Sequence, residues 1–213
     1  MMSEDLLIEY VTLLSERIRT DRGKQNNRFG NFTNQKKFSF NFFKELESRS
    51  DQALYASEFL KCLGQGSSRI TFLLNSRQVL KIALNPIGFS QNESEVDLFT
   101  NPVTKPLITK IFDFNKDFYW ILSEVVKEFT EEKQFEDATN IHWDDFVSDI
   151  MEDNARPVTK MGESVLQLMS ITHLLPLDLI YVYHWGLSAS GKVVILDYGY
   201  THDVKIKHYP KDH

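Results

Sequence analysis

Two apolar runs rich in β-branched residues stand only three residues apart, RITFLL at 69–74 and QVLKIAL at 78–84. Val, Ile and Thr favour extended backbone, and the intervening residues 75–77 (Asn-Ser-Arg) are typical of a tight turn. We therefore expect an antiparallel hairpin. It directly follows the two glycines of the segment LGQG at 63–66, where the period of the apolar residues changes.

The rest of the pattern predicts more strands and several helices. The runs 107–114 and 118–126 have strand character around a turn at 115–117, and VVILD at 193–197 is a further apolar strand. We expect helices at about 41–60, 141–153 and 159–175, and a short one at Gln91–Phe99 after Pro86 and Gly88 interrupt the pattern. The fold class is therefore α+β.

The first forty residues combine an amphipathic segment with a polar loop. Apolar residues at helical spacing predict a helix over 4–19, and the loop at 20–41 mixes Arg and Lys with four phenylalanines, Phe29, Phe32, Phe38 and Phe40. Such a mixture suits single-stranded nucleic acid, where bases stack on aromatic rings. Packing of these phenylalanines against the sheet is the alternative that we favour, so nucleic acid is not an expected partner.

Composition excludes some classes of protein. With 24 Lys and Arg against 30 Asp and Glu, the net charge of −6 argues against a surface that binds nucleic acid or anionic lipid throughout. The single cysteine, Cys62, allows no internal disulfide and suits a reducing compartment. No run is long and apolar enough to span a bilayer, and the acidic start lacks the features of a secretory signal. We expect a soluble, cytoplasmic protein with no membrane partner.

The glycines at 64 and 66 and the lysine at 81 suggest an anion site. Glycines allow backbone N–H groups to approach a phosphate, and Ser67 and Ser68 add hydroxyl donors, although an ordinary glycine turn would have the same sequence. Lys81 stands within an apolar strand, where a lysine either extends its ammonium group to solvent or meets an anion. Glu93 and Glu95 offer partners for it.

Two aspartates near the other end have the chemistry of a metal or proton-transfer site. Asp197 follows an apolar strand and precedes Tyr198-Gly199, and Mg²⁺ is commonly held by one or two carboxylates together with phosphates. Asp178 is expected at the end of an apolar helix, just past Pro176. An ordinary turn and a solvated loop are the alternatives for these two residues.

Together these segments resemble the protein-kinase-like superfamily. In that family a glycine-rich loop, a strand lysine, a helix glutamate, a hinge, a catalytic-loop aspartate and a D-F-G-type motif follow in this order. The resemblance covers about residues 58–200, and the 116 residues from Lys81 to Asp197 are close to the usual interval. The segments LGQGSSR, VLKIA and VVILDYG are also similar to small kinase-like proteins of tailed-phage genomes.

The resemblance implies ATP and Mg²⁺, with Mn²⁺ as a second choice, as cofactors. It implies that Lys81 pairs with phosphates and with Glu95, or with Glu93 in its place. It assigns Asp178 to orienting or deprotonating an attacking hydroxyl and Asp197 to the metal. The nucleotide would lie against the loop and against a hinge at 123–126, through Gly64, Gly66, Ser67, Ser68, Glu124 and Val126.

The sequence departs from the family at several positions. Arg69 stands where the loop usually has a third glycine, and Pro176-Leu177-Asp178 replaces the H-R-D triplet. Thirteen residues before Asp197, at the usual place of a metal-binding asparagine, stands His184. Imidazole prefers transition metals to Mg²⁺, so His184 either ligates the metal as a catalytic-loop residue or hydrogen-bonds Asp178 or a phosphate.

These features predict a two-lobed protein-kinase-like fold with an N-terminal helical extension at 1–57, an N-lobe and hinge at 58–126, and a minimal C-lobe at 127–213. Fourteen residues follow Gly199, too few for a conventional protein-substrate site, so we expect a phosphotransferase with a small or unusual acceptor. The alternative is a weak or inactive pseudokinase-like scaffold. Its acidic segment, with eleven Asp and Glu in 124–153, would bind a basic protein partner. In a third hypothesis the protein has this fold but does not bind nucleotide.

Overall fold

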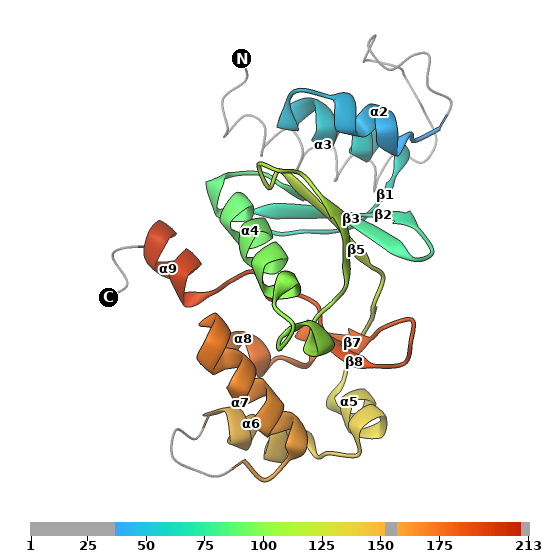
Figure 1. Ribbon diagram of the computed structural model, residues 1–213. Coiled ribbons are helices and arrows are strands. Elements are labelled where there is room, and N and C mark those ends of the chain that lie inside the picture. Colours follow the sequence, from blue (N-terminus) through green and yellow to red (C-terminus); the bar gives the residue numbers. More distant parts are fainter. Residues whose placement is uncertain (1–36, 152–156, 210–213) are drawn as a thin grey trace.

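The computed structural model describes residues 37–151 and 157–209 and has a mixed α+β architecture (Figure 1). The helix expected over 4–19, together with Phe29 and Phe32, lies outside these residues. Five strands form one antiparallel sheet in the order β1-β2-β3-β5-β4. Their bounds are β1 Lys61–Gln65, β2 Arg69–Asn75, β3 Gln78–Ala83, β4 Ile111–Phe114 and β5 Trp120–Glu124.

The predicted hairpin is confirmed. Strands β2 and β3 pair in antiparallel register, with Thr71 opposite Lys81 and Phe72 opposite Leu80. Alternation along these strands sends Ile70, Phe72, Leu80 and Ile82 to one apolar core, while Lys81 lies on the other face of the sheet. The strands expected at 107–114 and 118–126 are also present as β4 and β5, but the first is shorter because Lys105–Leu107 form a 3₁₀ helix, η1.

Two helices cover the apolar face, where we predicted a single helix over 41–60. That prediction was wrong in one respect: α2 (Phe40–Glu45) and α3 (Arg49–Phe59) are separated by an extended turn. The Ser48 side chain accepts a hydrogen bond from the Asp51 N–H at 3.0 Å, and this cap starts a new helix. Phe38 stacks on Tyr55 and Phe40 meets Trp120 edge to face, so these two phenylalanines pack against the sheet as we favoured.

The opposite face of the sheet is covered by α4 (Pro86–Thr100), which is longer than the predicted 91–99 (Figure 1). Pro86 does not interrupt this helix, because it occupies the first turn, where a backbone N–H has no intrahelical partner. Asn85 caps the helix by accepting a hydrogen bond from the Gly88 N–H at 3.1 Å. A side chain at Gly88 would overlap the Ser68 carbonyl oxygen, so the glycine permits α4 to approach the loop before β2.

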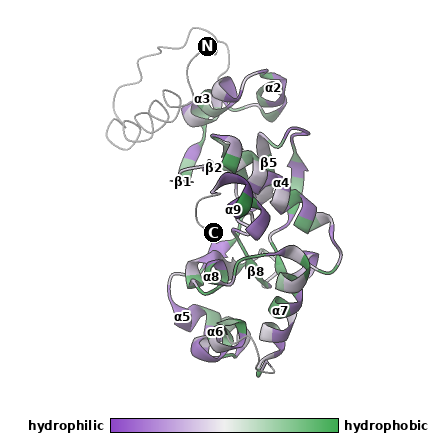
Figure 2. Cartoon of the chain, turned by 90° about the vertical axis from the view of Figure 1, so that its left-hand side faces the viewer, coloured by the Kyte–Doolittle hydropathy of each residue, from purple (hydrophilic) through white to green (hydrophobic). Residues whose placement is uncertain are grey.

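A second core lies below the sheet in Figure 1, among helices and a small sheet with the strand order β6-β7-β8. Figure 2 shows hydrophobic and hydrophilic residues mixed along α7, one of these helices. Phe135, Phe146 and Trp185 are fully buried at the centre of this core. The elements are β6 Lys127–Glu128, α5 Glu132–Thr139, α6 Trp143–Met151, α7 Lys160–Thr172, α8 Pro176–Leu179, η2 Val182–His184, β7 Trp185–Leu187, β8 Val193–Ile195 and α9 His202–His208.

The predictions for this half were partly right. Helices α6 and α7 and strand β8 correspond to the segments expected at 141–153, 159–175 and 193–197, whereas α5, α8 and α9 were not predicted. Asp178 is not at the end of the long helix. His173, with φ of 56°, ends α7 in a left-handed cap, and Asp178 lies on the separate short helix α8. None of the described helices is long and apolar enough to cross a lipid bilayer.

Candidate functional site

A cavity of about 440 Å³ lies between the five-stranded sheet and the segments at 183–184 and 196–197. This volume is within the range of roughly 300–1,000 Å³ that is usual for small-molecule sites. Its walls come from the glycine loop, the inner face of β2 and β3, the end of β5 and the residues around Asp197. The lining residues are Leu63, Gly64, Gly66, Ser67, Ser68, Arg69, Thr71, Val79, Lys81, Gln91, Thr109, Ser123, Glu124, Val125, Val126, Glu128, Tyr183, His184, Leu196 and Asp197.

The glycine loop is a tight turn that is fastened to α4. The Gly66 N–H donates to the Arg69 carbonyl at 2.9 Å, and a Cβ placed on Gly64 would meet nothing within 4 Å. The Ser68 hydroxyl is already engaged, since it donates to Oε1 of Gln91 at 2.6 Å. Ser67 is exposed. The loop is therefore open on its ligand side and fixed on its helix side.

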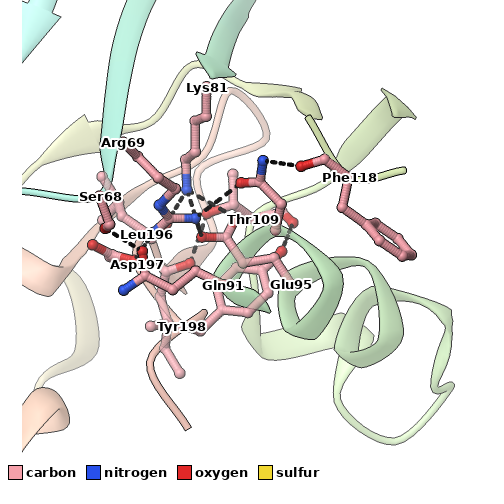
Figure 3. A network of polar contacts seen from close by, with 12 residues as sticks. Ser68, Arg69, Lys81, Gln91, Glu95, Thr109, Phe118, Leu196, Asp197 and Tyr198 are labelled. Carbon is pink, nitrogen blue, oxygen red and sulfur yellow. Dashed lines mark hydrogen bonds and ion pairs between the residues drawn. The ribbon is translucent and has the colours of Figure 1, made fainter. Parts of the chain in front are cut away.

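Lys81 and Glu95 form a tight ion pair beneath the loop (Figure 3). Nζ of Lys81 lies 2.9 and 3.0 Å from the two carboxylate oxygens of Glu95 and donates to the Leu196 carbonyl at 3.1 Å. The Glu95 side chain is 1% exposed, whereas Glu93 points away and is exposed. Of the two glutamates that the sequence offered, Glu95 is the partner of Lys81.

Arg69 is the residue of the site that the sequence interpretation missed. Its Nη1 lies 2.5 Å from Oε1 of Glu95, and its Nη2 pairs with Oδ1 of Asp197 (Figure 3). The alternation of side chains along β2 between the two faces of the sheet could have placed Arg69 at the site. Ile70 and Phe72 face the apolar core, so Arg69 and Thr71 share the face of Lys81. We call Arg69, Lys81, Glu95 and Asp197 the charge cluster.

Asp197 is the exposed member of the charge cluster, with a side chain 53% exposed against 1% for Glu95. Desolvation by the surrounding protein atoms would raise the pKa of Asp197, but the positive charges of Arg69 and Lys81 outweigh it and lower the pKa to about 2. The next residues hold this carboxylate in place. Tyr198 is buried and donates its hydroxyl to the Thr109 carbonyl at 2.9 Å, and Gly199 packs so closely on Gln91 that a Cβ would lie 2.6 Å from its carbonyl oxygen.

Asp178 and His184 form a second polar group beside the charge cluster. Nδ1 of His184 donates to the backbone carbonyl of Asp178, and His184 lines the cavity while Asp178 does not. Oδ2 of Asp178 is buried and has no hydrogen-bond partner among the described residues. Burial raises the pKa of Asp178 to about 6, with the nearby Asp197 acting in the same direction and His184 opposing it.

The end of β5 contributes polar groups to the opposite wall. The N–H groups of Glu124 and Val125 are used, because they donate to the carbonyls of Lys110 and Arg77, each at 2.9 Å. Within the described part of the chain, the Val126 N–H has no hydrogen-bond partner. The Ser123 hydroxyl is also unpartnered there, although this side chain is only 1% exposed. Two free donors thus adjoin the cavity.

The donor set fits a hard divalent cation only if a ligand completes it. Asp197 keeps Oδ2 without a partner in the described residues, and phosphate oxygens are the usual further ligands of Mg²⁺. Nδ1 of His184 is engaged by a carbonyl, so only its Nε2 remains for a metal. In residues 37–151 and 157–209 no group of three or more His, Cys, Asp or Glu is placed to hold a metal ion.

Comparisons with known proteins add little to this geometry. Neither a protein-family model nor a curated protein matches the chain. One similar solved structure is the streptomycin–ATP–APH(2'')-IIa ternary complex, at 16% identity and a TM-score of 0.32. The match covers 66% of this chain and 65% of the other, so this chain spans less than two thirds of that protein. Similarity at this level does not assign a fold or a function.

Proposed function

We propose that this chain binds ATP in the cavity and transfers a phosphoryl group to a small or unusual acceptor. It does so with a two-lobed protein-kinase-like fold, in which 1–57 is an extension, 58–126 the N-lobe and hinge, and 127–213 a minimal C-lobe. One observation carries the proposal: Lys81, held by the buried Glu95 and bonded to the Leu196 carbonyl, lines the same cavity as Asp197, and the glycine loop lines it too. Cytoplasmic location and a relation to phage proteins remain predictions.

The phosphates would lie between the loop and Lys81. The ammonium group has three donors, of which two go to Glu95 and one to the Leu196 carbonyl. A phosphate oxygen would replace that carbonyl, because a charge-assisted hydrogen bond is stronger than one to a neutral acceptor. The Gly66 N–H is used in the turn, but the absence of a side chain at Gly64 and Gly66 would let the phosphates approach the rest of the loop backbone.

The base would lie against the end of β5. The free Val126 N–H and the buried Ser123 hydroxyl are donors without partners among the described residues, and each matches an acceptor on a purine ring. Burying an unpaired polar group costs free energy, so a ligand that satisfies these two donors gains affinity. Glu124 would contribute through its backbone.

Asp197 would hold Mg²⁺ or Mn²⁺ through its unpartnered oxygen, and the bound cation would neutralise charge on the phosphates. Asp178, with its pKa of about 6, has the proton affinity suited to taking the proton of an acceptor hydroxyl. His184 would orient Asp178 through its hydrogen bond to the backbone of that residue. After Gly199 the described chain turns directly into α9, and Lys207 of α9 donates a hydrogen bond to the Ser90 hydroxyl of α4 at 3.0 Å.

A pseudokinase-like scaffold is the second candidate, and one observation favours it. Asp178 does not line the cavity, and Arg69 already pairs with one oxygen of Asp197. In that case nucleotide binding would persist without turnover. The acidic residues of 124–153 would then meet a basic protein partner.

Calorimetry and thermal unfolding test the proposal with the parent protein, Lys81→Ala and the exposed-site control Lys192→Ala. At a hundredfold excess of ATP over its Kd we expect about 2.7 kcal/mol of stabilisation in the parent and in Lys192→Ala. For a chain of this size that is a rise in Tm of roughly 5–10 °C. Lys81→Ala should lose most of it. Equal binding by both variants, or no binding by the parent with any metal, would contradict the proposal.

Turnover separates the two candidates. If the chain is an enzyme, Asp178→Asn should lower the rate of phosphate release or autophosphorylation by at least about 100-fold while ATP affinity stays within twofold. His184→Asn, tested beside it, reports whether the orientation of Asp178 matters for the rate. A parent protein that binds ATP but shows no turnover above that of Asp178→Asn would establish the scaffold.

A further inference from the structure

The charge cluster is neutral by itself. Arg69 and Lys81 bring two positive charges, and Glu95 and Asp197 bring two negative ones, all joined by direct ion pairs. The Arg69 side chain is only 9% exposed, although it carries a full charge. A buried guanidinium is stable when carboxylates surround it, and both of its terminal nitrogens are used in this way.

We propose that Arg69 is a resident cation on Asp197, which competes with a divalent metal for that carboxylate and yields it when the metal–nucleotide complex binds. This inference rests on the proposed function in taking Asp197 as the metal residue. It goes beyond that function because it assigns to Arg69 a role in setting how strongly the site depends on metal.

The exposure of the two carboxylates decides which contact is exchanged. Glu95 is 1% exposed and also holds Lys81, so its contact with Nη1 of Arg69 is shielded from solvent and from ligands. Asp197 is 53% exposed and lines the cavity, so an incoming cation reaches it directly. Arg69 would therefore keep Glu95 and release Asp197. The released Nη2 would remain beside the cavity as a donor for phosphate.

Simultaneous occupation of Asp197 is unfavourable on charge grounds. A guanidinium and a divalent ion on one carboxylate would lie a few ångströms apart, and like charges at that distance repel strongly at a site partly removed from water. The cluster has no spare negative charge to offset this repulsion, since Glu95 is already shared by two cations. Metal and Arg69 thus exclude each other at Asp197.

The direct test measures Mn²⁺ alone, without nucleotide, by electron paramagnetic resonance on the full chain. Arg69→Met keeps the length of the side chain and removes its charge, and Arg77→Met is the matched control on the exposed turn between β2 and β3. We expect Mn²⁺ to bind at least about tenfold more tightly to Arg69→Met than to the parent, and Arg77→Met to match the parent. Adding Asp197→Asn to Arg69→Met should remove the gain.

Two outcomes overturn the inference. One is Mn²⁺ affinity within twofold of the parent in a folded Arg69→Met variant. The other is a gain that survives Asp197→Asn. If Arg69→Met does not fold, the test is made on the parent protein. The Nε–H NMR signal of Arg69 is then followed while Mg²⁺ is added. A shift that saturates with the metal and is absent in Asp197→Asn supports the exchange, and an unchanged signal at saturating Mg²⁺ refutes it.

Nucleotide titrations keep this inference separate from the proposed function. For each protein, the affinity for ATP with Mg²⁺ is divided by the affinity for ATP with a chelator. This ratio should be at least about tenfold larger for Arg69→Met than for the parent, because the variant loses the guanidinium that would pair with the phosphates when no metal is present. ATP binding with an unchanged ratio would leave the function standing and refute the role of Arg69. Tighter Mn²⁺ binding by the variant, in a chain that binds no ATP, would refute the function alone.

Discussion

The charge cluster and the Asp178–His184 group both reach the same cavity, yet they are satisfied to very different degrees. In the cluster, Glu95 is held by two cations and Asp197 by one, and Lys81 uses all three of its donors. At Asp178 a buried carboxylate oxygen has no partner among the described residues. The ionic groups of the first region are thus mutually paired, whereas the second holds a buried carboxylate oxygen that is left without a hydrogen bond among these residues.

The largest expected effect comes from breaking the cluster at its centre. Glu95→Gln would leave Arg69 and Lys81 without their shared counter-charge in a buried place, so the free energy of unfolding should fall by about 3–5 kcal/mol. Urea denaturation measures it. Glu93→Gln, on an exposed position of the same helix, should change stability by less than about 0.5 kcal/mol. Equal losses in the two variants would mean that the cluster adds no stability of its own.

A change at Asp178 should act in the opposite direction and depend on pH. Because its pKa rises from 3.8 to about 6 on folding, the folded protein binds a proton more readily between those values. Stability from this group is complete below pH 4 and is lost as the pH rises through 6. At pH 7 Asp178→Asn should therefore be more stable than the parent by about 1–2 kcal/mol, since part of the shift is screened by water.

Denaturation of the parent and Asp178→Asn at several pH values checks this sign. The difference between them should be near zero at pH 3.5, grow between pH 4 and 6, and stay constant above. Asp97→Asn is a suitable control, because this carboxylate is exposed on α4. A difference that is the same at every pH would show that Asp178 does not carry the raised pKa.

The smallest effect concerns the attachment of the glycine loop. Ser68→Ala removes the hydrogen bond to Gln91 and should cost about 0.5–1.5 kcal/mol, while Ser67→Ala, whose side chain is exposed, should cost almost nothing. The pair of variants, compared by urea denaturation, shows whether the loop is fixed before a ligand binds. Equal stabilities would indicate that the loop is not held by α4 through this contact.

Local patterns predicted the elements that depend on near neighbours. The hairpin of β2 and β3 follows from alternation and a three-residue turn, and the pairing of Lys81 with a glutamate fourteen residues later follows from the order of strand and helix. The break between α2 and α3 was missed, because a serine cap at Ser48 competes with a continuous apolar period. Pro86 was misjudged, because a proline that starts a helix and one that ends it look alike in sequence.

The site was less predictable than the strands, because its residues are far apart in the sequence. Arg69 and Asp197 are 128 residues apart, and neither local sequence pattern indicates that their side chains are in contact. Family resemblance made Arg69 only a bulky replacement for glycine. The unpaired Ser123 hydroxyl and the unpaired oxygen of Asp178 are likewise properties of the folded chain, since they depend on which neighbours are missing in three dimensions. The roles assigned to the site residues remain predictions.

One turn of α4 has a mechanical consequence for the whole molecule. Within Gly88–Asn92, Gly88 lies against the Ser68 carbonyl, Gln91 holds the glycine loop and Gly199, and Asn92 donates to the Phe118 carbonyl at 2.8 Å. Ser90 meets Lys207 and His208 of α9, each at 3.0 Å. Glycine loop, Asp197 segment and α9 are thus coupled through five consecutive residues. A rotation of α4 that follows a movement of the glycine loop would therefore also displace α9, because both are bonded to the same turn of this helix.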